Sequence, residues 1–243
     1  MRLTSDFFQR PSRVVAESLL GKLLVRRLSS GVRLSGIIVE VEAYLADNDQ
    51  ASHSFRGATK RNASMFAHPG TLYVYTIHNR HCLNVVTEKN GKGAAILVRA
   101  LEPVEGLKVM QQFRSPGAED SREPNPPWTA ASALHLMSAL HLTSALHLTS
   151  GPGKLCQALA VDLSHDGSDL VTGTEIWLES MPLASNDWSV RRSPRIGISK
   201  AQHRRLRYYV DGNRWVSGKA SDHSRGRCCS FQQWTDAKTN NQT

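Results

Sequence analysis

The chain has 243 residues, 40% of them hydrophobic and 21% charged, which is enough to bury a sizeable core and excludes a disordered or fibrous protein. Lysine and arginine total 30 against 21 aspartate and glutamate, a formal net charge of +9. Residues 181–243 carry 12 basic and 4 acidic side chains, whereas residues 116–180 carry 2 and 8. This excess fits a polyanionic partner such as nucleic acid or an acidic membrane surface, and it also fits a merely solubilising surface.

Hydrophobic periodicity predicts short strands with helices before and after them. Helical spacing occurs over 11–20, 103–114 and 153–162. Segments typical of strands occupy 23–28, 36–45, 71–78, 83–87, 94–101, 174–179, 194–198 and 206–210. The polar stretch 46–69 predicts a long loop, and Asn90-Gly91-Lys92-Gly93 predicts a hairpin turn. Together these elements indicate an α+β domain with a mainly antiparallel sheet.

Residues 116–150 differ from the rest of the chain. Within them a six-residue unit, Ala-Leu-His-Leu-Thr-Ser with Met in place of Thr in the first copy, runs three times from Ala133 to Ser150. A period of six winds the leucines around a helix, and three copies are too few for a solenoid. The histidines allow a metal-binding tract as an alternative. We expect a tandem duplication in a tolerant surface loop.

Two carboxylates and a phenol share one face of the strand at 36–45, namely Glu40, Glu42 and Tyr44. The apolar flanks of this strand indicate a central position, where acids are costly unless they face a cleft, a cation or water. A catalytic carboxylate and an ordinary alternating edge strand are both compatible with this pattern. Arg99, inside another apolar run, must likewise find an anion, either a sheet carboxylate such as Glu42 or Glu40 or a ligand.

Cysteine spacing and hydropathy bear on metal binding and location. The cysteines lack the paired spacing of a zinc site, so free thiols in a reducing compartment are expected. His78, His81 and Cys82 cluster without a second ligand pair, and we expect no metal there. The N-terminus has no signal-peptide core, and no stretch approaches the roughly 18 apolar residues of a membrane-spanning helix. The expected location is intracellular, in the cytoplasm or nucleoid of a bacterium or the nucleus of a eukaryote.

Short motifs follow one another in a fixed order along the chain. They lie at 3–8, 20–27, 38–45, 51–54, 60–62, 65–75, 97–103, 151–159, 194–198 and 206–210. Together they resemble the alkyladenine (3-methyladenine, methylpurine) DNA glycosylase family over about residues 1–115 and 150–218. The resemblance implies a single α+β glycosylase domain over 1–218, with a curved, mainly antiparallel β-sheet core flanked by helices. It leaves 116–150 as a low-complexity insertion and 219–243 as a basic, disordered tail.

The resemblance also implies a base-excision-repair enzyme without a cofactor or metal. Such an enzyme flips a damaged purine out of double-stranded DNA and hydrolyses its N-glycosidic bond, leaving an abasic site. The implied substrates are 3-methyladenine and 7-methylguanine, with ethenoadenine and hypoxanthine as further candidates, and the implied protein is a monomer. Glu42 matches the general base that activates water, and Arg99 and the backbone carbonyl of Ile196 match groups that position this water. The residues that match the base-binding pocket are Tyr44, His53, Tyr75 and Asn84.

The chain departs from the family pattern just after Tyr75. The family places an intercalating tyrosine there, whereas this segment is about one residue shorter and His78 occupies the position. His78 is therefore the expected DNA wedge, although it is smaller and more polar than tyrosine. The changed wedge leaves a non-catalytic damaged-DNA binding protein as an alternative function. A basic RNA-binding or interaction module that uses residues 181–227 is a third.

Overall fold

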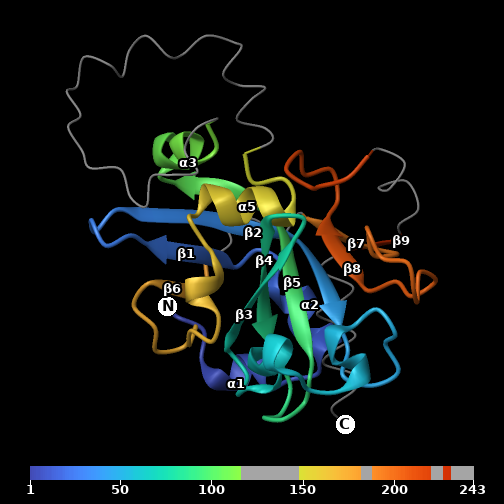
Figure 1. Ribbon diagram of the computed structural model, residues 1–243. Coiled ribbons are helices and arrows are strands. Elements are labelled where there is room, and N and C mark those ends of the chain that lie inside the picture. Colours follow the sequence, from blue (N-terminus) through green and yellow to red (C-terminus); the bar gives the residue numbers. More distant parts are fainter. Residues whose placement is uncertain (116–147, 182–187, 220–226, 231–243) are drawn as a thin grey trace, which may run out of the picture.

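An antiparallel sheet forms the body of the molecule (Figure 1). The computed structural model describes residues 1–115, 148–181, 188–219 and 227–230, and nine strands of these residues form one sheet. The strands are β1 Leu23–Arg27, β2 Arg33–Tyr44, β3 Leu72–Ile77, β4 Arg80–Val86, β5 Ala95–Glu105, β6 Ile176–Glu179, β7 Ser189–Ser193, β8 Arg207–Val210 and β9 Arg227–Ser230. They follow the order β3-β4-β5-β2-β8-β7-β9, and β1 pairs with both β2 and β6. Every pairing is antiparallel, which confirms the predicted sheet and the α+β class.

Short helices lie around the sheet. The α-helices are α1 Ser5–Phe8, α2 Ser12–Leu19, α3 Leu107–Phe113 and α5 Pro152–Ala158, and the 3₁₀ helices are η1 His53–Arg56, η2 Lys60–Phe66 and η5 Leu163–His165. The stretch 46–69, predicted as a loop, thus contains η1 and η2. None of the helices in the described part of the chain has the length and apolar character needed to cross a membrane.

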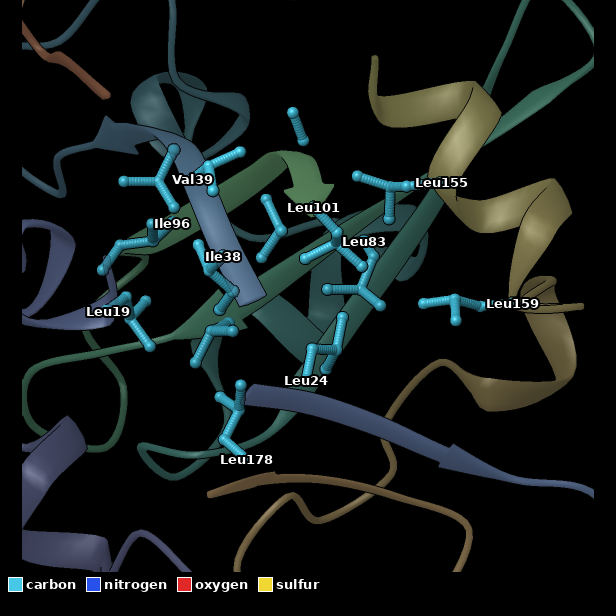
Figure 2. Close-up of a cluster of buried hydrophobic side chains, with 14 of the residues drawn as sticks. Leu19, Leu24, Ile38, Val39, Leu83, Ile96, Leu101, Leu155, Leu159 and Leu178 are labelled. Atoms are coloured by element: carbon cyan, nitrogen blue, oxygen red, sulfur yellow. The ribbon is translucent and has the colours of Figure 1, made fainter. Parts of the chain in front are cut away.

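The core lies against the face of β2 that carries its valines. Val39 and Val41 are buried there, as the alternation predicts, while Glu40 and Glu42 occupy the other face. Figure 2 shows Leu19 of α2, Leu155 of α5 and Leu159, which directly follows α5, around this core. Because the core supports β2 from one side, the acidic face of the strand is held in a fixed position.

Two predicted elements are displaced in the structure. The helix expected over 103–114 begins only at Leu107, because β5 continues to Glu105 and pairs with β2, and Gly106 then turns with a φ of 79°. The prediction of a strand over 194–198 is wrong. The strand here is β7, which ends at Ser193, since Pro194 cannot donate to a ladder and Gly197 has a φ of 75°.

The end of the repeat segment belongs to the folded body. Leu148, expected in a surface loop, is only 3% exposed and lies in the core cluster. Thr149 is buried and donates its hydroxyl to the carbonyl of Leu101 over 2.6 Å, and Ser150 forms a β-bridge with Ala100. The rest of the insertion lies outside the described residues.

Part of the segment 219–243, which was expected to be a disordered tail, is ordered. Residues Arg227–Ser230 form β9, which pairs with β7, so this stretch of 219–243 is a strand. The remainder of the segment beyond residue 219 lies outside the described residues.

Candidate active site

Strands β2 and β5 bring together the acids and the arginine that the sequence singles out. The side chains of Glu40 and Glu42 are 0% exposed, and that of Arg99 is 8% exposed. The register between the strands shifts near Glu40, so that Ala100 and Val98 have partners on β2 whereas Arg99 has none. Such irregularities re-aim side chains. Arg99 reaches both carboxylates, Glu40 at 2.9 Å and Glu42 at 3.2 Å.

Glu42 accepts hydrogen bonds on both carboxylate oxygens. Its Oε1 accepts from the backbone N–H of Ile196 over 2.7 Å and lies 3.2 Å from Nη1 of Arg99. Its Oε2 accepts from the Tyr44 hydroxyl over 3.0 Å. The contact from Ile196 to this carboxylate is thus made by its N–H, and the role of its carbonyl stays a prediction. The three contacts fix the carboxylate beside Tyr44.

Glu40 is held by two arginines and a backbone N–H group. Its Oε1 accepts from Nε of Arg99 over 2.9 Å and from Nε of Arg207 over 2.7 Å. Its Oε2 accepts from the backbone N–H of Ser217 over 2.6 Å. Glu40 therefore anchors Arg99, and its same-face spacing with Glu42 was the sequence signal for this cluster.

A small cavity lies beside Tyr44. It is lined by Tyr44, His53, Met65, Tyr73, Tyr75 and Asn84. All four residues that the family resemblance assigns to a pocket are therefore brought together. The resemblance did not assign the other two. Tyr73 shares a strand face with Tyr75, a usable signal, whereas nothing in the local sequence distinguishes Met65 from a core residue.

The aromatic rings of the cavity pack edge to face or tilted. His53 and Tyr75 have centroids 4.5 Å apart at 72°, and Tyr73 and Tyr75 lie 5.6 Å apart at 33°. Nδ1 of His53 is 2.8 Å from the Tyr73 hydroxyl. These contacts preorganise the walls of the cavity.

The cavity walls carry no charge at neutral pH. Burial raises the pKa of Tyr73 to about 12, and burial also raises the pKa values of Tyr44 and Tyr75. Burial, and then the nearby Arg61, lowers the pKa of His53 below its usual range. A planar ring that enters the cavity would meet neutral aromatic surfaces.

Asn84 lies deep in this arrangement. Its side-chain amide donates to the carbonyl of Tyr73 over 3.0 Å and to that of Cys82 over 3.2 Å. Both bonds tie Asn84 to the β3–β4 pair, so its position is rigid.

His78 lies at the tip of the β3–β4 hairpin. Ile77 pairs with Arg80, so His78 and Asn79 form a two-residue turn, with φ values of 46° and 58°. Two left-handed residues are typical of the tight type I′ turn, which accounts for the short segment. His78 is exposed at this tip. Its role as a wedge stays a prediction.

Two of the three possible zinc ligands, His81 and Cys82, are engaged in other contacts. Cys82 is a buried free thiol that hydrogen-bonds Tyr75, and Nδ1 of His81 is 3.2 Å from the hydroxyl of Thr76. Across the described ranges, no three His, Cys, Asp or Glu side chains gather as metal ligands.

Curated proteins of several organisms are similar to most of this chain. A putative 3-methyladenine DNA glycosylase of Rhodopirellula baltica is 45% identical over 93% of the chain and 87% of its own length. The DNA-3-methyladenine glycosylase of Mus musculus is 44% identical over 89% of the chain and 61% of its own length. The Homo sapiens protein of the same name is 42% identical over 89% of the chain and 68% of its own length.

A family profile covers the same region. Residues 6–214 match the family described as Methylpurine-DNA glycosylase. This range includes the whole of the cavity lining, and it includes all the residues that contact Glu40 and Glu42 except Ser217. The chain therefore belongs to the methylpurine-DNA glycosylase family.

Proposed function

We propose that this protein is a base-excision-repair DNA glycosylase that hydrolyses the N-glycosyl bond of alkylated purines in double-stranded DNA. Membership of the family and the names of its relatives support the reaction class. The observation that carries the proposal is the position of Glu42. This buried carboxylate is fixed by Arg99, Ile196 and Tyr44, and Tyr44 itself lines the aromatic cavity.

Glu42 acts as general base in the proposed mechanism. An alkylated purine such as 3-methyladenine or 7-methylguanine is cationic and leaves without much acid assistance. The enzyme then has to supply water at the sugar carbon and to stabilise oxocarbenium-like charge. A carboxylate serves both purposes, because it accepts the proton of the water and its negative charge lies close to the developing positive charge. Arg99 and the backbone carbonyl of Ile196 position this water.

The cavity receives the flipped base. Its neutral rings attract a cationic purine by stacking and cation–π interaction and do not repel it by charge. Ethenoadenine and hypoxanthine, which are planar and neutral, are further substrates by shape. Asn84 crowds the exocyclic amino group of a normal guanine, and His78 fills the gap that the flipped nucleotide leaves in the duplex.

The test is a duplex oligonucleotide with a single lesion, incubated with excess enzyme and then cleaved with hot alkali at abasic sites. Parallel duplexes carry 7-methylguanine, ethenoadenine or hypoxanthine. We expect strand cleavage with at least one lesion in the wild type and its loss in Glu42→Gln. Glu105→Gln is the matched control, because it makes the same change at an exposed ion pair with Arg33, which is 38% exposed.

Two results would reject the proposal. One is the absence of cleavage with every lesion, and the other is full activity in Glu42→Gln. Lesion-specific binding without base release would instead favour a damaged-DNA binding protein with an impaired wedge at His78. Equal affinity for RNA and undamaged DNA would favour the RNA-binding alternative.

A further inference from the structure

A buried guanidinium covers one face of Tyr44. The Cζ atom of Arg195 lies 4.5 Å from the centroid of the Tyr44 ring, and the Arg195 side chain is 0% exposed. Arg195 does not line the cavity, whereas Tyr44 does. The guanidinium of Arg195 therefore occupies one face of the Tyr44 ring, and the rest of the ring lines the cavity.

Asp49 neutralises this guanidinium. Its two carboxylate oxygens each accept from a different nitrogen of Arg195, Nη1 and Nη2, over 2.7 Å. The backbone N–H groups of Leu45 and Ala51 also donate to Asp49, and Nη1 of Arg204 lies 4.0 Å from it. Burial raises the pKa of the Asp49 carboxyl, but the bonds from Arg195 and Leu45 lower it by more, so Asp49 is ionised at neutral pH.

We propose that the Asp49–Arg195 pair sets the preference of the cavity between cationic and neutral purines, acting through Tyr44. This inference rests on the proposed glycosylase function and adds a specificity determinant to it. A cation on one face of an aromatic ring opposes the attraction of a second cation to the same ring. Asp49 cancels that opposition, so Tyr44 can stack on an alkylated, positively charged base.

The size of the effect follows from charge separation. A base stacked on the free side of Tyr44 would lie about 8 Å from the guanidinium, where two unit charges interact measurably at the effective dielectric of a protein surface. Removing the Asp49 charge should therefore lower the efficiency with which a cationic base is captured and excised, on the order of tenfold relative to a neutral one.

The experiment compares two lesions in the same protein. Single-turnover rate constants are measured with enzyme in excess of DNA but below saturation, so that they include capture of the base as well as bond cleavage. One duplex carries 7-methylguanine, which is cationic, and the other carries hypoxanthine, which is neutral. The ratio of the two constants does not depend on the fraction of folded enzyme, because unfolded molecules bind neither duplex. In Asp49→Asn we expect the 7-methylguanine to hypoxanthine ratio to fall on the order of tenfold.

The reciprocal variant moves the ratio in the opposite direction. Arg195→Met leaves a negative charge behind Tyr44, so the ratio should rise, and the double variant Asp49→Asn/Arg195→Met should restore the wild-type ratio. Either single variant is a complete test if the other does not fold. Asp47→Asn is the matched control, because it removes an acid of the same loop that is 77% exposed and pairs with Lys92, and its ratio should equal that of the wild type.

The outcomes separate the two proposals. If the wild type releases neither base, the glycosylase function fails. If it releases both but the folded single variants keep the wild-type ratio, or both shift it in one direction, the role of Asp49 and Arg195 is overturned and the function stands.

Discussion

Two glutamates of β2, only two residues apart on the same face, have opposite surroundings. Glu40 is enclosed by Arg99, Arg207 and the backbone N–H of Ser217. Glu42 shares Arg99 but adjoins Tyr44, which lines the cavity. The same residue type on one strand thus has two environments, since one carboxylate balances two buried guanidiniums and the other is bonded to a tyrosine of the cavity wall. Neighbouring elements, more than the strand itself, decide which groups each glutamate contacts.

The largest expected effect is on the activity that depends on Glu42. Glu42→Gln keeps the shape of the side chain and removes the base, so base release should slow by about 10²–10⁴-fold. Single-turnover cleavage of a lesion duplex measures this loss. Binding of the same duplex should change little, and a comparable loss of binding would contradict the assigned role.

Glu40→Gln should instead reduce stability. It leaves the guanidiniums of Arg99 and Arg207 buried without their shared anion, and breaking a buried ion pair in this way costs about 3–5 kcal/mol. Urea denaturation measures the free energy of unfolding. In Glu105→Gln, which breaks an exposed pair, the loss should stay below about 1 kcal/mol. Equal losses of unfolding free energy in Glu40→Gln and Glu105→Gln would contradict the structural role of the buried Glu40 ion pairs.

A smaller effect is expected from the hydroxyl of Tyr73. Tyr73→Phe removes the 2.8 Å contact with Nδ1 of His53 and keeps the ring, so unfolding should become easier by about 0.5–1.5 kcal/mol. Thermal denaturation measures the stability. The rate of excision of a neutral lesion shows whether the cavity wall at His53 has become less well ordered. Unchanged values for both would show that ring packing alone holds His53.

The smallest effect is a pH dependence at His53. Its pKa is lowered in the folded protein, first by burial and then by Arg61, so below the usual histidine pKa the unfolded chain binds more protons at this position. Its contribution to stability is therefore complete above the unfolded pKa, about 6.5, and is lost as the pH falls toward the folded value. His53→Gln should flatten the fall in stability below this pH in denaturation curves. An identical slope in the variant and the wild type would contradict the lowered pKa.

Local patterns predicted those parts of the site that lie on single strands. A period of two is enough to place Glu40, Glu42 and Tyr44 on one face, and the strand structure bears this out. The apolar surroundings of Arg99 left two alternatives, an ion pair with a sheet carboxylate or a role as a site arginine, and the structure pairs it with two sheet carboxylates.

Contacts between distant segments were not predictable in the same way. Asp49 and Arg195 are 146 residues apart in sequence, and nothing in either segment indicates the other. Met65 lines the cavity only because η2 packs beside β3. The apolar run at 194–198 matched a strand by composition, but Pro194 and the turn at Gly197 override that preference.

The packing of Leu148 and Thr149 determines what a change in the number of six-residue units would do to the core. The second and third copies both end in Leu-Thr-Ser, so an in-frame loss or gain of one of these units leaves Leu-Thr-Ser directly before Gly151. The buried leucine and the hydroxyl that bonds Leu101 are thereby regenerated after each change in length. A change in the number of six-residue units would therefore lengthen or shorten this insertion and leave the core contacts of Leu148 and Thr149 in place.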